Sequence, residues 1–136
     1  MVILFSDKIY KHIITKKFMT TLIACLSTGK GTWGHVNRLI EDGKYDNVFL
    51  ITNDYGKENF NKSIKTELIS INLNHGLNDL RDEIIKNLKG KIKDSEVDVN
   101  FVSGTGKEHM AFMAALLKLG VGIRLRALTK EGVEEI

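Results

Sequence analysis

Short apolar runs alternate along this chain with stretches whose apolar residues recur at helical spacing. Continuous apolar runs are typical of strands buried on both faces of a parallel sheet. Five strands are predicted on this basis, at 21–26, 48–52, 67–73, 97–102 and 121–129. Apolar residues three and four apart predict helices at 33–43, 77–88 and 110–119, and the polar stretch 53–65 has room for a short one.

This alternation predicts an α/β fold: a single doubly wound, Rossmann-like, mostly parallel five-stranded sheet with helices on both faces. We expect the strand order 3-2-1-4-5, which makes the first and fourth strands neighbours. Ligands of such sheets bind beyond the carboxyl ends of the strands, where the winding reverses. In the fifth strand Arg124 and Arg126 share one face, which suggests an edge position or an oligomer contact.

Composition narrows the class of protein. A chain of 136 residues fits one domain, which we place at 19–136, and residues 1–18 form an N-terminal extension of unknown role. A single cysteine, Cys25, excludes an internal disulfide and fits the reducing cytoplasm; its place in an apolar strand indicates a core residue. No apolar run approaches the length of a membrane span. The dispersed net charge of +3 suits a small anionic ligand better than a long nucleic acid.

Two glycine-rich loops carry the candidate chemistry. The first glycine loop, residues 27–34, follows the first strand, and the second, residues 103–109, follows the fourth. Each opens a helix, where backbone N–H groups and the helix dipole favour phosphate. We expect the loops to line one crevice and bind a phosphate-bearing nucleotide. The ligand-binding residues predicted there are Gly29, Lys30, Gly31, Thr32, His35, Asn53, Ser103, Gly104, Thr105, Gly106 and Glu108.

Other interpretations of these loops stay open. Residues 29–34 match G-x-G-x-x-G, and Asp54 lies near the end of the second strand, as in a dinucleotide fingerprint. Bulky Trp33 and the longer turn argue against that interpretation. The second loop has Phe101 in place of the first Walker A glycine and Glu108 after the lysine, which disfavours an ATPase. Both loops are also compatible with plain tight turns between strand and helix.

Few other residue groups indicate chemistry. His35 and His109 fall in the first turns after the two loops, where each can contact phosphate or move a proton. No cysteine, histidine or carboxylate spacing indicates a metal site, and no cofactor is expected. The predicted core of the last helix consists of Met110, Phe112, Met113, Leu116 and Leu117.

The second loop and its surroundings resemble a known family. Residues 99–116, with a strand, then Ser103-Gly104-Thr105-Gly106-Lys107, a methionine and an alanine-rich helix, resemble the fourth-strand motif of CRISPR-associated Rossmann-fold (CARF) domains. Leu26-Ser27-Thr28-Gly29 is similar to that family's first-strand motif. The likeness extends over most of residues 21–129 in the expected fold, but in the sequence it is confined to the two loops. Ser103 in place of a glycine, and the extra Gly106, depart from the pattern.

The resemblance implies a homodimer that binds cyclic oligoadenylate across its two-fold axis. Some members, the ring nucleases, cleave this ligand without a metal by attack of a ribose 2′-OH. For such a reaction we expect Lys107 to neutralise charge on phosphorus, Ser27 or Thr28 to orient the scissile group, and His109 to act as the acid. The R-x-x-x-x-H motif of the family's ribonuclease effectors is absent from the sequence. The alternatives are a non-catalytic adaptor that binds a protein partner and a small nucleotide-binding enzyme outside CRISPR defence.

Overall fold

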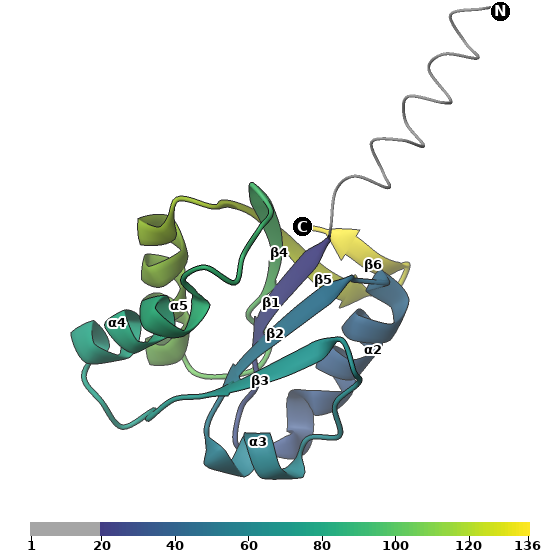
Figure 1. Ribbon diagram of the computed structural model, residues 1–136. Coiled ribbons are helices and arrows are strands. Elements are labelled where there is room, and N and C mark those ends of the chain that lie inside the picture. Colours follow the sequence, from purple (N-terminus) through teal and green to yellow (C-terminus); the bar gives the residue numbers. More distant parts are fainter. Residues whose placement is uncertain (1–19) are drawn as a thin grey trace, which may run out of the picture.

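A computed structural model describes residues 20–136 and confirms the α/β class, with one mostly parallel sheet (Figure 1). The expected extension 1–18 and Met19 lie outside the described residues. The sheet has the order β3-β2-β1-β4-β5-β6. Its strands are β1 (Thr21–Cys25), β2 (Asn47–Thr52), β3 (Thr66–Ser70), β4 (Glu96–Asn100), β5 (Gly122–Thr129) and β6 (Gly132–Glu135). The helices are η1 (Lys30–Thr32), α2 (Trp33–Gly43), α3 (Asp54–Asn59), α4 (Leu77–Leu88) and α5 (Gly106–Leu119).

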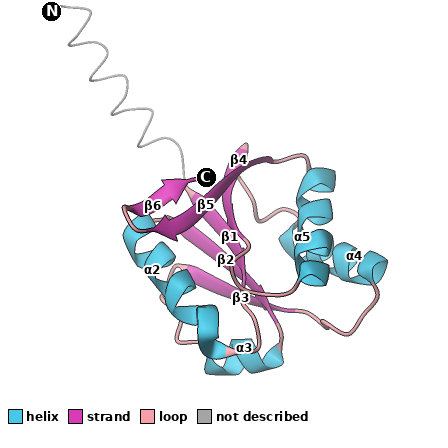
Figure 2. Cartoon of the chain, turned by 180° about the vertical axis from the view of Figure 1, so that it is seen from behind, coloured by secondary structure: helices cyan, strands magenta, loops and turns pink. Residues whose placement is uncertain are grey.

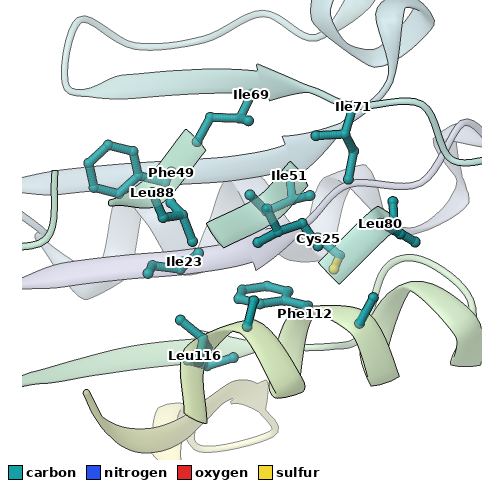
Figure 3. Packing of buried hydrophobic residues seen from close by; sticks show 14 of the residues in the cluster. Ile23, Cys25, Phe49, Ile51, Ile69, Ile71, Leu80, Leu88, Phe112 and Leu116 are labelled. Atoms are coloured by element: carbon teal, nitrogen blue, oxygen red, sulfur yellow. The ribbon is translucent and has the colours of Figure 1, made fainter. Parts of the chain in front are cut away.

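Helices cover both faces of the sheet, as Figure 2 shows. Because side chains alternate along a strand, neighbouring residues of β1 belong to two different cores. Leu22 and Ala24 pack with the apolar face of α2, while Ile23 and Cys25 pack with α4 and α5. Figure 3 shows the second core, in which Cys25 lies close to Ile51 and Phe112. The sheet is therefore packed against helices on both faces.

The expected order 3-2-1-4-5 is confirmed, but the sheet has six strands instead of five. The chain turns back after Thr129, and β6 pairs antiparallel with β5. The apolar pattern does not reveal β6, because this four-residue strand carries two glutamates and only one apolar residue. The last β5 residue, Thr129, pairs with Gly132, whose φ of 111° suits the tight turn.

The prediction that Arg124 and Arg126 mark an edge strand is wrong, and their part in an oligomer contact stays a prediction. β5 lies between β4 and β6, and both arginines face Asp98 of β4. Arg124 Nε lies 3.0 Å from Asp98 Oδ1, and Arg126 Nε lies 3.1 Å from Oδ2. Tyr45 donates its hydroxyl to the same carboxylate at 2.7 Å, and burial together with this bond raises the tyrosine pKa above its usual value. The two cations therefore compensate a carboxylate that is only 4% exposed.

Helix α5 differs from its prediction in two ways. It begins at Gly106, four residues before the predicted start at 110, because a capping box formed by Thr105 and Glu108 stabilises the first turn. Phe112 and Leu116 are buried as predicted, but Met110 and Leu117 are 64% and 66% exposed. Placing these two in the core was wrong. They lie seven residues apart, and therefore share the helix face opposite the sheet.

Candidate functional site

The two glycine loops meet at the carboxyl edge of the sheet. β1 pairs in parallel with β4, and the last pair of this register joins Ala24 to Asn100. The chain therefore leaves both strands at the same level. The expected strand order also made β1 and β4 neighbours.

Ser103 holds the two loops together. Its hydroxyl oxygen accepts the backbone N–H of Ser27 at 2.7 Å and the hydroxyl of Thr32, also at 2.7 Å. Ser103 is fully buried, so the acceptor of both bonds is shielded from water, while Ser27 and Thr32 are half-buried. The departure from the family's glycine at this position thus has a structural role. Both loops belong to one hydrogen-bonded unit.

The first glycine loop is closed by its own side chains. The Ser27 hydroxyl donates to the carbonyl of Gly29 at 2.7 Å, and the Trp33 indole N–H donates to the carbonyl of Ser27 at 2.9 Å. The Trp33 ring turns into the core, where it packs edge-on against Phe60 at 5.5 Å between centroids. Lys30 Nζ lies 5.8 Å from the centre of the same ring. The bulk of Trp33 is therefore directed away from the turn.

The second glycine loop presents a helix N-terminus. The Thr105 hydroxyl accepts the Glu108 N–H, and the Glu108 carboxylate accepts the Thr105 N–H at 2.9 Å. Within residues 20–136, this capping box leaves the N–H groups of Gly106 and Lys107 for water or a ligand. The Lys107 ammonium donates to the carbonyl of Leu73 at 3.3 Å, across the gap between α5 and the segment after β3.

The two candidate histidines are placed differently from each other. His109 Nε2 lies 2.8 Å from the carbonyl oxygen of Ser103, so that nitrogen donates, and the ring packs 5.2 Å from Phe101. His109 therefore supports the second loop. His35 belongs to the first turn of α2, and its Nε2 is 3.4 Å from both the Asn100 amide nitrogen and the Leu128 backbone nitrogen.

A cleft of about 780 Å³ lies beside the loops, and we call it the edge cleft. Four predicted residues line it: Thr28, Asn53, Thr105 and Glu108. Asp54, named above only for the dinucleotide fingerprint, also lines the cleft. The remaining lining residues were not predicted from the sequence: Tyr55, Ser70, Ile71, Asn72, Leu73, Asn74 and Glu83. Only their position in the sequence could have indicated these residues. Asp54 and Asn72 come shortly after β2 and β3, and both strands end at the same edge of the sheet. Lys30, Gly31 and His35 do not line the cleft.

Carboxylates dominate the charge inside the edge cleft. Asp54, Glu83 and Glu108 line it, whereas lysine and arginine are absent from its lining within residues 20–136. Lys107 lies at its border, next to Leu73. The interior therefore favours hydrogen-bond donors, and positive charge is confined to the side where the loops lie.

Other chemistry receives little support from the described residues. Cys25 is 2% exposed, and burial with the nearby Glu108 charge raises the pKa of its thiol above the usual value, which confirms a core role. Residues 20–136 contain no group of three or more histidines, cysteines and carboxylates that could hold a metal ion. No helix in this part of the chain has the length and apolar character to cross a membrane.

Comparison with known proteins leaves the family open. The sequence matches no protein-family model, and a search of curated proteins gives no match. The likeness to CARF domains therefore stays a prediction that rests on the two loops.

Proposed function

We propose that this protein binds a phosphate-bearing nucleotide at the carboxyl edge of its sheet, with cyclic oligoadenylate as the favoured ligand. One observation carries the proposal: Ser103 joins the two glycine loops beside an open cleft of about 780 Å³. Plain tight turns explain each loop alone. They do not explain why both loops, a lysine and a helix N-terminus converge beside one cleft.

Phosphate fits the loop side of this region. The N–H groups of Gly106 and Lys107 are at the start of a helix of 14 residues, where the dipole adds partial positive charge. The Lys107 ammonium adds a full charge and already reaches the cleft border at Leu73. The Glu108 carboxylate is held by the Thr105 N–H at 2.9 Å, which directs it into the capping box. We therefore assign Lys107 as the main phosphate contact.

Binding receives more support than cleavage. The Ser27 hydroxyl donates to Gly29, and His109 Nε2 donates to Ser103, so both groups brace the loops. Lys107 and Thr28 stay exposed and fit the roles of charge neutralisation and orientation expected of them. Metal-independent cleavage by a 2′-OH is thus a second step of the proposal, to be read from the same experiment.

The experiment uses the full chain and a panel of cyclic oligoadenylates, AMP and ATP. Thermal shift measures binding, and mass spectrometry measures linear products. We expect a cyclic ligand to raise the melting temperature and Lys107→Ala to weaken this binding at least tenfold, since one charged hydrogen bond contributes about 1.5–3 kcal/mol. Lys118→Ala, at the other end of the same helix, is the matched control. Equal binding by wild type and Lys107→Ala would contradict the assignment.

A second candidate function is an adaptor that binds another protein, and the exposed face of α5 favours it. Met110 and Leu117 are 64% and 66% exposed, and Leu125 on β5 is 41% exposed. Contact with a protein partner would remove this apolar surface from water. In the nucleotide proposal two copies pair into a homodimer with their glycine loops facing each other across the two-fold axis. The molar mass in solution distinguishes these cases, because a dimer forms without any other protein.

A further inference from the structure

A second pocket lies at the amino edge of the sheet, opposite the edge cleft. Its volume is about 410 Å³, and it lies between the end of α2 and the segments that lead into β2 and β3. We call it the helix-end pocket. Its apolar lining comes from Ile40, Tyr45 and Val48. Pockets of about 300–1,000 Å³ with mostly apolar walls are typical of small-molecule sites.

The fold holds the walls of this pocket in place. The Tyr45 hydroxyl donates to Asp98 at 2.7 Å, and Tyr45 is only 5% exposed. A Cβ at Gly43 would collide with the Tyr45 ring, so glycine allows α2 to end directly against that ring. On the other wall, the Val48 N–H donates to the carbonyl of Lys65 at 3.0 Å. The pocket therefore keeps its shape through contacts within the protein.

Two lysines add positive charge to the pocket. Lys44 and Lys65 both line it, and both are exposed. Within residues 20–136, neither ammonium group forms an ion pair with a carboxylate. Among the described lining residues Glu41 is the one carboxylate, so two lysines against one glutamate leave a net charge of +1. This lining favours a ligand with a single negative charge.

The backbone of Lys44 is unusual for a lysine. It follows the end of α2 with φ 52° and ψ 50°, and it is the only non-glycine residue of 20–136 with a positive φ. Glycine is the usual residue at such a helix end, because a side chain makes the left-handed conformation unfavourable. A lysine in this strained position, on the lining of a pocket, is best explained by a role for its ammonium group.

We propose that the helix-end pocket binds a small amphipathic monoanion, with its carboxylate at Lys44 and Lys65 and its apolar body against the apolar lining. Burial of the apolar body removes its surface from water. The carboxylate stays at the exposed lysines, where it keeps contact with water and accepts hydrogen bonds from the ammonium groups. Glu41 disfavours a ligand with several negative charges. This site is separate from the edge cleft, and the inference does not rest on the proposed nucleotide binding.

The test is an NMR titration of the full chain with octanoate and with octylammonium, which has the same apolar chain and the opposite charge. We expect octanoate to shift the backbone amide signals of Tyr45 and Val48 and to bind about tenfold more tightly than octylammonium, as for two exposed ion pairs. Butyrate, which has four fewer CH₂ groups, should bind at least about tenfold more weakly than octanoate.

Lys44→Gly is the decisive variant. We expect it to lower the octanoate affinity about threefold, as for one exposed ion pair. It should not lower the melting temperature, because glycine adopts this backbone without a steric clash. Lys89→Gly, at the end of α4 and outside the pocket lining, is the matched control and should leave the affinity unchanged. Lys65→Gln gives a second reading, since the hydrogen bond of Lys65 to Val48 uses the backbone carbonyl.

Three results would overturn the inference: amide shifts confined to other parts of the molecule, equal affinities for octanoate and octylammonium, or equal effects of Lys44→Gly and Lys89→Gly. Vesicles of phosphatidylglycerol distinguish a lipid surface from a small ligand. Binding to these vesicles without binding of octanoate would assign the lysines to a membrane surface and would also overturn it. Nucleotide binding by Lys44→Gly should match wild type, so the two proposals can fail independently.

Discussion

The two glycine loops look alike in sequence, but the fold constrains Gly104 differently from Gly29 and Gly31. In the second glycine loop Gly104 has a φ of 102°, and a Cβ there would lie 2.6 Å from Glu108 Oε2. In the first, Gly29 and Gly31 have no such φ, and an added Cβ would meet nothing within 4 Å. The fold thus requires glycine at position 104 and leaves it optional at positions 29 and 31, as it does at Gly106 of the second loop. Where the fold does not require glycine, the close approach of a ligand to the backbone is the best explanation for the residue.

The largest effect is expected at Gly104. Gly104→Ala places a side chain in the left-handed region and against the capping box, so we expect about 2–3 kcal/mol loss in the free energy of unfolding. Urea denaturation measures it. The control is Gly90→Ala, where φ is 81° but nothing lies within 4 Å of the added Cβ, and where about 1 kcal/mol is expected. Equal losses at both sites would show that the capping-box contacts do not matter.

A smaller effect is expected at the bridge between the loops. Ser103→Ala leaves the Ser27 N–H and the Thr32 hydroxyl without their buried acceptor, which should cost about 1–3 kcal/mol in the free energy of unfolding. Thr32→Val removes one donor and should cost less. Chemical denaturation of both variants tests this ranking. A Ser103→Ala variant as stable as wild type would mean that the loops do not depend on each other.

The smallest effect on stability is expected in the first loop. Gly29 has an extended backbone, with φ −84° and ψ 142°, that alanine adopts readily. Gly29→Ala should leave the free energy of unfolding unchanged or raise it by about 0.5 kcal/mol, because the unfolded chain loses freedom. Nucleotide binding, measured by the same thermal shift as above, should weaken. Unchanged binding would indicate that no ligand approaches this backbone.

The sequence predicted the sheet well because buried parallel strands carry continuous apolar runs, as in 21–26 and 48–52. It did not predict β6, because two of the four residues in this short edge strand are glutamates. It also did not predict that Arg124 and Arg126 pair with Asp98, because Asp98 is distant from them along the chain. For the candidate site, the pattern placed both glycine loops at one edge. It could not show which side chains, such as Asp54 and Ser70, would meet there, because contacts between strand ends depend on register and turn geometry.

The hydrogen bond between Ser27 and Ser103 also bears on the order of folding. It joins residues 76 positions apart in the chain. Contacts across such long loops carry a high entropic cost, and they form after more local ones. β1 cannot pair with β4 until the polypeptide has been made to about residue 100. A nascent chain should therefore bring the two glycine loops together only after β4 has been synthesised.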